Sequence, residues 1–179
     1  TKYAAFAEGY KVYFDPSTRF MRGLDSEGNW RTSFNPRAST HRNDDYCEGT
    51  AWQWTWFVPH DVDSLVELMG GRDAFIGKLD SLFVADSSLE GESVSVDISG
   101  LIGQYAHGNE PSHHIAHLYN YVGQPYKTQA LVDSVLHTLY FNEPNGLSGN
   151  EDCGQMSAWY VLNAMGFYQV CPGKPVYSI

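Results

Sequence analysis

Three segments of the sequence place carboxylates beside aromatic, amide or glycine residues, and these are the places where acid–base chemistry could occur. The first contains Glu48, within residues 47–54 (CEGTAWQW). A carboxyl group beside several tryptophan rings is poorly solvated as an anion, which favours the protonated form that a general acid needs near neutral pH. The alternative is a helix-terminal Glu that makes an ordinary hydrogen bond. The spacing alone leaves both interpretations open.

The second segment, residues 108–114 (GNEPSHH), combines amide, carboxylate and imidazole groups at a predicted helix start. Asn109 and Glu110 could bind a substrate hydroxyl or a hard cation. His113 and His117 are four residues apart, as two zinc ligands on one helix face would be. No third ligand follows at metalloprotease spacing, and no Glu lies between them in the HExxH pattern. We therefore interpret them as buried, hydrogen-bonded histidines, with a zinc hydrolase as a remote alternative.

The third segment, residues 149–157 (GNEDCGQMS), carries two adjacent carboxylates, Glu151 and Asp152, on a loop flanked by glycines. Such a loop suits either a cation site or a base that activates water. Asp152 could equally be a helix N-cap that accepts a hydrogen bond from Gln155 or from a nearby backbone N–H. Both interpretations remain open at this stage.

The composition favours chemistry on a sugar over chemistry on a nucleic acid. Aromatic residues make up 15% of the 179 residues, and 21 acidic residues against 11 Lys and Arg give a net charge of −10. Binding to phosphate backbones needs a basic face, so we expect no nucleic-acid partner. No apolar run approaches the ~20 residues that span a bilayer, so we expect no membrane insertion. Aromatic rings and paired carboxylates are typical of glycosidase sites.

The elements that position these segments are predicted to be mostly helical, with residues 1–46 rich in loops. Residues 51–58 alternate tryptophans and could form a strand or a buried helix, and the polar residues 86–98 read as a loop. The apolar periodicity and the turn residues give the remaining elements. Helices are predicted over residues 61–69, 73–85, 111–122, 125–140 and 155–165.

Three cysteines, Cys47, Cys153 and Cys171, show no metal-binding spacing. We expect reduced, buried thiols, and a disulfide between Cys153 and Cys171 is the alternative in an oxidising compartment.

The three segments together resemble motifs of glycoside hydrolase family 92, the calcium-dependent exo-acting α-mannosidases. Residues 48–54 (EGTAWQW) with 58–61 (VPHD) match the first motif, and residues 107–114 (HGNEPSHH) with 119–125 (YNYVGQP) match the second. Residues 149–160 (GNEDCGQMSAWY) match the third. The motifs occur in the family's order, and the resemblance extends over nearly the whole chain, from about residue 3 to residue 179.

The resemblance implies roles for particular residues of this chain. Glu48 matches the family's general acid and Asp152 its general base, in an inverting hydrolysis that needs about 6.5–9.5 Å between the two carboxyl groups to admit a water. Asn109, Glu110 and Asp152 lie where Ca²⁺ and the sugar hydroxyls are expected. The residues implied for substrate binding are Trp52, Gln53, His60, Asp61, Glu110 and His113.

The fold class implied by the resemblance is mostly α, as part of an (α/α)6 helical barrel catalytic domain. We expect residues 1–179 to be a segment of that domain, with an N-terminal β-sandwich and the rest of the barrel outside the chain, and no signal peptide within it. The family implies mannose-containing glycans as partners and a secreted or periplasmic parent protein. The alternative function is a truncated, non-catalytic carbohydrate-binding helical module.

Overall fold

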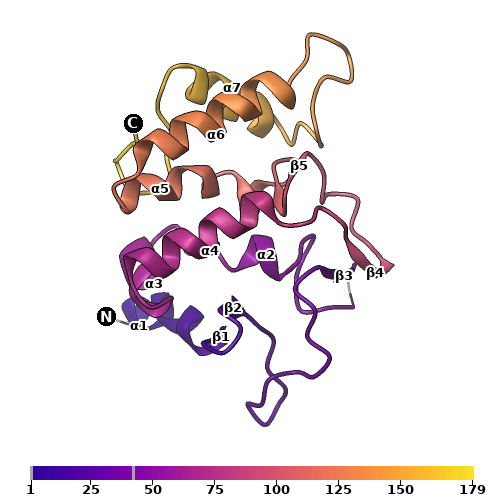
Figure 1. The fold of residues 1–179 in the computed structure, drawn as a ribbon, viewed down its shortest axis with the longest axis vertical. Helices are drawn as coiled ribbons and strands as arrows, with labels where there is room; N and C mark the ends of the chain where they lie inside the picture. The colour runs from indigo at the N-terminus through magenta and orange to yellow at the C-terminus, as the bar shows by residue number, and fades with distance from the viewer. Residues whose placement is uncertain (1, 42) are drawn as a thin grey trace.

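The computed structural model describes residues 2–41 and 43–179 and shows a helix-rich chain with short strands (Figure 1). The helical elements occur in two forms, α-helices and 3-10 helices. The α-helices are α1 Lys2–Ala7, α2 Ala51–Trp54, α3 Val62–Leu68, α4 Arg72–Val84, α5 Leu118–Tyr121, α6 Pro125–Thr138 and α7 Gln155–Ala164. The 3-10 helices are η1 Gly9–Tyr13, η2 Glu110–Ser112 and η3 Ile115–His117. The described residues confirm the helix-rich fold class, and the (α/α)6 barrel remains a prediction.

The strands form three separate two-stranded sheets. The antiparallel pairs are β1 Phe14–Asp15 with β2 Phe20–Met21, in which Phe14 faces Met21, and β5 Leu101–Ile102 with β6 Tyr105–Ala106, in which Leu101 faces Ala106. The parallel pair is β3 Ala38–Thr40 with β4 Glu90–Ser93, in which Ala38 faces Glu90.

Strand β4 lies within residues 86–98, which the sequence predicted to be a loop. All four residues of β4 are exposed, so the strand has no apolar alternation that the sequence could reveal. It forms because backbone groups pair with β3, about 50 residues earlier in the chain.

The aromatic stretch after Thr50, which could have been strand or helix, begins as the short helix α2. Thr50 starts it with a capping box, in which the Thr50 hydroxyl accepts from the Trp52 N–H at 3.2 Å. In return the Gln53 Oε1 accepts from the Thr50 N–H at 2.7 Å. Reciprocal bonds of this kind satisfy the free N–H groups of a first helical turn.

The single helix predicted over residues 111–122 is wrong, because the segment is divided into η2, η3 and α5. In a continuous α-helix the His117 N–H would donate to the His113 carbonyl. That carbonyl instead accepts from the Trp159 indole N–H at 2.9 Å, and the His117 N–H donates to His114 at 3.0 Å. A tertiary hydrogen bond therefore replaces a local one.

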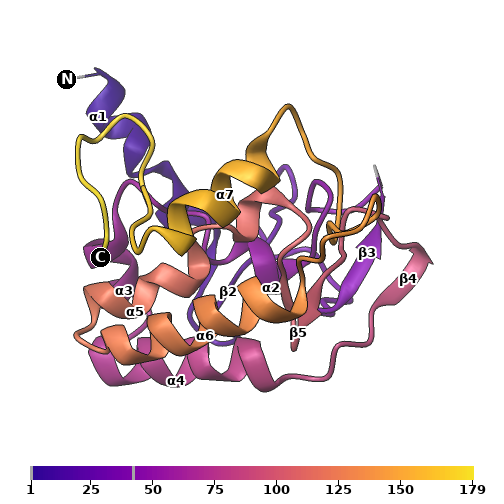
Figure 2. The same ribbon diagram turned by 90° about the horizontal axis from the view of Figure 1, so that it is seen from above.

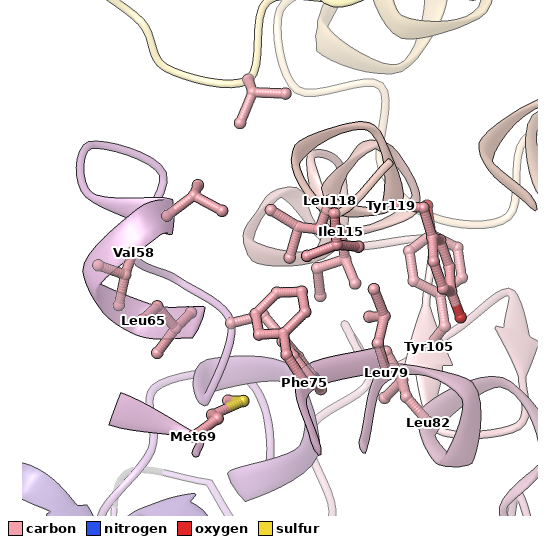
Figure 3. Close-up of a cluster of buried hydrophobic side chains, with 14 of the residues drawn as sticks. Val58, Leu65, Met69, Phe75, Leu79, Leu82, Tyr105, Ile115, Leu118 and Tyr119 are labelled. Atoms are coloured by element: carbon pink, nitrogen blue, oxygen red, sulfur yellow. The ribbon is translucent and has the colours of Figure 1, made fainter. Parts of the chain in front are cut away.

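The buried apolar core is made by residues of α3, α4, the η3–α5 segment, α6 and α7. The two ribbon views show how these helices are arranged (Figures 1 and 2), and the close-up shows members of the core such as Leu65, Phe75 and Leu118 (Figure 3). The apolar periodicity that predicted a helix over residues 73–85 is confirmed on α4: Phe75, Leu79 and Leu82 are fully buried, and Ile76 and Phe83 pack against the same cluster. Among the described residues no helix is long and apolar enough to cross a membrane.

The three cysteines are free thiols, which agrees with the reduced state we expected. Their expected burial is wrong, because Cys47 and Cys153 are exposed and Cys171 is half-buried.

Candidate active site

The structure brings the carboxylates of all three predicted segments together. Glu110, at the start of η2, shares a side-chain hydrogen bond with Asp152 and also feels the charge of Glu48. Burial raises the pKa of Glu110, and the hydrogen bond with Asp152 and the charges of Asp152 and Glu48 raise it further. These three residues, separated by up to about 100 positions in the chain, form one acidic cluster.

Glu48 sits on a tightly anchored turn. Its backbone has a φ of +53°, and its carbonyl accepts from the Asn109 side-chain amide at 2.9 Å. The preceding carbonyl, of Cys47, accepts from the Trp54 indole N–H at 2.7 Å. Of the two interpretations left open for Glu48, desolvation by neighbouring tryptophans is not the one observed: its side chain is exposed, and the Trp54 N–H holds the backbone of the turn.

Replacing Gly49 by Ala tests this anchor. A Cβ at position 49 would lie 2.7 Å from the Trp54 Nε1 and 2.8 Å from its Cδ1, so the indole must move and its bond to Cys47 is lost. Because misplacing a reacting group by about 1 Å can cost 100-fold, we expect G49A to lower kcat/KM at least tenfold. Glycosidase kinetics measure the loss. Gly77→Ala on α4, where a Cβ meets nothing within 4 Å, is the control; equal activities of both variants would contradict the anchoring role.

Glu151 and Asp152, adjacent in sequence, have different surroundings. The Glu151 carboxylate accepts from the Ser157 N–H at 3.2 Å and from the Ser157 hydroxyl at 3.0 Å, so it caps the first turn of α7. Asp152, Cys153 and Gly154 have φ values of +48°, +58° and +97°. This left-handed turn separates the two carboxylates and places the exposed Asp152 beside Glu110. The capping role that the sequence allowed for Asp152 is taken by Glu151.

Four histidines in or next to the second segment, His107, His113, His114 and His117, are buried. For His113 and His117 this confirms the interpretation as hydrogen-bonded core residues. Burial lowers the pKa of His107 to about 3 and the pKa values of His113, His114 and His117 to about 4, so all four are neutral at pH 7. The Nε2 of His107 lies 2.7 Å from the Tyr140 hydroxyl, and the Nε2 of His113 lies 3.0 Å from the His107 carbonyl. The Nε2 of His114 lies 2.8 Å from the Trp56 carbonyl, and the Nε2 of His117 lies 2.8 Å from the Asn163 Oδ1.

The other residues expected to bind substrate make contacts elsewhere in the structure. Trp52 packs its ring edge-on against Phe20 at 4.9 Å. Gln53 is buried and donates to the Gln104 carbonyl at 2.6 Å in addition to its role in the cap.

His60 and Asp61 contact the N-terminal residues of the chain. The His60 Nε2 lies 3.0 Å from the Ala7 carbonyl, and Asp61 accepts from the Tyr10 hydroxyl at 3.1 Å. The carbonyl of His60 also accepts from the Lys174 ammonium at 2.7 Å. Both ribbon views place α1 and the C-terminal residues on the same side of the molecule as α3 (Figures 1 and 2).

A cavity of about 530 Å³ borders the Glu48 turn, and the sequence reasoning missed it. Its walls include Tyr10, Tyr13, Tyr46, Cys47, Trp54 and Phe57. The size is typical of small-molecule sites, and aromatic walls suit the apolar faces of a sugar. Its residues are dispersed over positions 10–58, so no local motif marks it.

The donor set of Asn109, Glu110 and Asp152 consists of hard oxygen ligands of the kind that Ca²⁺ prefers. Two carboxylates close enough to share a hydrogen bond repel each other when both are ionised, and a divalent cation would remove that repulsion. The residues therefore fit the expected ion. In the described part of the chain no group of three or more His, Cys, Asp or Glu side chains could hold a metal ion by itself. Any site here needs the Asn109 amide and further oxygens.

Facing carboxylates on a helix-rich scaffold, beside an aromatic cavity, are characteristic of the glycoside hydrolase class of enzymes. The whole chain, residues 1–179, matches the glycosyl hydrolase family 92 catalytic domain. The chain belongs to this family.

Solved structures and a fungal relative agree with this membership. A family GH92 α-mannosidase of Bacteroides thetaiotaomicron, solved with mannoimidazole, is 44% identical with a TM-score of 0.85, over 94% of this chain and 22% of that chain. A family GH92 inverting mannosidase of the same species is 41% identical with a TM-score of 0.79, over 98% of this chain and 24% of that chain. An uncharacterized secreted glycosidase of Arthroderma benhamiae is 31% identical over 140 residues, 78% of this chain and 16% of the relative. The chain thus spans less than a quarter of these proteins.

Proposed function

We propose that this chain carries the acid–base machinery of an enzyme that removes terminal mannose from α-mannosides. The observation that carries the proposal is the convergence of Glu48, Glu110 and Asp152 from three distant segments. The similarity to two mannosidases, one solved with mannoimidazole, supports mannose as the sugar. The name of the fungal relative supports an extracellular parent protein.

In the proposed reaction, Glu48 donates a proton to the leaving oxygen while Asp152 accepts a proton from the attacking water. Inversion follows because water and leaving group are on opposite faces of the sugar, and it requires about 6.5–9.5 Å between the two carboxyl groups. The exposed positions of both side chains leave them accessible to sugar and water. Glu110 is half-buried and interacts with both carboxylates, and in this proposal it binds a sugar hydroxyl.

Asn109, Glu110 and Asp152 are the residues that would hold Ca²⁺ in this proposal. When bound, the cation would supply a Lewis acid that polarises sugar hydroxyls and favours a ring conformation near the oxocarbenium-like transition state. The chain's own part is to orient the ligands: the Asn109 amide N–H donates to the Glu48 carbonyl, and the left-handed turn aims Asp152 at Glu110.

The second candidate function is a non-catalytic carbohydrate-binding module. The aromatic cavity beside Cys47 and Trp54 favours it, since such a cavity can bind a sugar without any acid or base. It differs from the first proposal in one measurable respect, because it predicts binding of mannose without release from a disaccharide.

The test is mannose release from α-1,2-linked mannobiose, first with calcium and then with excess chelator. We expect release that falls at least 100-fold with the chelator, with β-mannose as the first anomer in the proton NMR spectrum. The assay is run on the 179 residues and on the longest protein that contains them. Binding without release from either protein would favour the carbohydrate-binding module, and α-mannose as the first anomer would contradict inversion.

A further inference from the structure

Helix α7 is joined to His113 at two points, one helical turn apart. The side-chain amide nitrogen of Gln155, the first residue of α7, lies 3.1 Å from the His113 Nδ1. The indole N–H of Trp159 donates to the His113 carbonyl at 2.9 Å. Gln155 and Trp159 are four residues apart and so lie on one face of the helix. We refer to Gln155, Trp159 and His113 as the clamp.

The polarity of the Gln155 bond follows from the other partner of the imidazole. The His113 Nε2 lies 3.0 Å from the His107 carbonyl, which can only accept, so the Nε2 carries the hydrogen. In the neutral ring the Nδ1 then has a lone pair and accepts from the Gln155 amide. This fixes which end of the Gln155 amide faces His113, and only a donor at position 155 satisfies the bond.

The clamp joins the two backbone segments that carry the paired carboxylates. His113 directly follows η2, and its N–H donates to the Glu110 carbonyl at 3.0 Å. On the other side, the Gln155 N–H donates to the Asp152 carbonyl at 3.2 Å. The Gln155–His113 bond thus connects two residues that are themselves bonded through their backbones to the carboxylate residues, His113 to Glu110 and Gln155 to Asp152.

The backbone around Asp152 needs such support. Asp152 and Cys153 are non-glycine residues in the left-handed region, a conformation whose cost in free energy surrounding contacts must offset. Upstream, the loop is held where Gly149 packs on Gly108, since a Cβ at position 149 would lie 2.3 Å from the Gly108 carbonyl oxygen. Downstream, the clamp provides the corresponding contact.

We propose that Gln155 is a positioning residue for Asp152: by donating to the His113 Nδ1 it holds the start of α7 so that the Asp152 carboxyl stays beside Glu110. The inference rests on the proposed function, in which Asp152 is the base. Gln155 itself does not touch the reacting atoms, and acts through the turn that precedes it.

The test compares Gln155→Met, which keeps the side-chain length and removes the donor, with Gln129→Met, the same change on the exposed side of α6. In the longest active form of the enzyme, at saturating calcium, we expect Q155M to lower kcat about tenfold with KM changed less than threefold, because displacement of the base affects the transition state more than the bound sugar. Q129M should match the parent. A rise in KM with unchanged kcat, or equal behaviour of the two variants, would overturn the proposal.

A nitrogen-15 NMR measurement on the 179 residues adds a readout independent of activity. The wild-type His113 should show one tautomer, with the Nε2 protonated and the Nδ1 hydrogen-bonded. Q155M should shift the Nδ1 resonance and leave Nε2 unchanged; an unchanged Nδ1 would overturn the proposed bond.

Asp152→Asn separates the inference from the function on which it rests. If D152N keeps full activity, the assignment of the base fails regardless of Gln155. If D152N is inactive while Q155M keeps its kcat, the function stands and the positioning role of Gln155 alone is wrong.

Discussion

Glu48→Gln should lower hydrolysis of mannobiose by about 100- to 10,000-fold while leaving an aryl α-mannoside with a good leaving group almost unaffected. General acid catalysis contributes a factor of that size where the leaving oxygen needs a proton. A leaving group that departs as a stable anion needs no proton, so the loss of the acid then has little effect. Glu48 is suited to this assignment because its side chain is exposed on an anchored turn.

Asp152→Asn should behave differently, with a loss of about 100-fold or more on both substrates. The attacking water needs a base whatever the leaving group is, so the activated substrate offers no rescue. Steady-state kinetics of both variants on both substrates give a two-by-two comparison. Glu143→Gln, an exposed acid on the loop that precedes the Asp152 turn, is the matched control. Equal losses on the two substrates for E48Q would contradict its role as the acid.

Acidification should unfold the chain between about pH 6 and pH 4, because four buried histidines must be protonated when it unfolds. The folded pKa of His107 is about 3, and those of His113, His114 and His117 are about 4, against an ordinary value of 6.5. Burial is the main cause in each case, since the charged ring loses its hydration.

The sign follows from the lowered folded pKa values. Below pH 6.5 the unfolded chain binds protons that the folded chain does not, so the histidines' contribution to the free energy of unfolding is complete above pH 6.5 and falls down to about pH 4. Each histidine contributes at most about 1.4 kcal/mol per pH unit. Glu110 acts in the opposite direction, because its raised pKa makes the folded state bind the proton more tightly, but it is one group against four.

Urea unfolding measured from pH 8 to pH 4 checks this expectation, since the slope of the free energy against pH counts the protons taken up. His117→Gln should reduce the slope by about one proton below pH 6, whereas His137→Gln, on the exposed side of α6, should change it little. A free energy of unfolding that stays constant between pH 6.5 and pH 4.5 would contradict the burial of these histidines.

The helices with strong local signals could be predicted from the sequence to within a few residues. α4 and α7 follow the apolar periodicity of residues 73–85 and 155–165, and α6 begins at Pro125, where the sequence predicted its start. The divided segment around His113 could not be predicted, because the bond from Trp159 that interrupts it comes from 46 residues away.

The candidate site was predicted in part. The three motifs identified the family, and the whole-chain match confirms it. The sequence left the surroundings of the acid open, and the structure shows that the neighbouring tryptophans do not enclose Glu48, whose backbone has a φ of +53° and whose side chain is exposed. The aromatic cavity combines residues from several short elements, so only the assembled chain reveals it.

By itself the sequence determined the family, the principal helices and the acidic residues available for chemistry, because each of these depends on residue types at short spacing. Only the tertiary structure decided which of the two adjacent acids, Glu151 or Asp152, lies beside Glu110, because the sequence around the two is nearly the same. The physical reason is the backbone: consecutive left-handed residues after Glu151 leave its carboxylate on Ser157 and direct Asp152 to Glu110, 42 positions earlier in the chain. Contacts over such separations depend on packing, which no local pattern encodes.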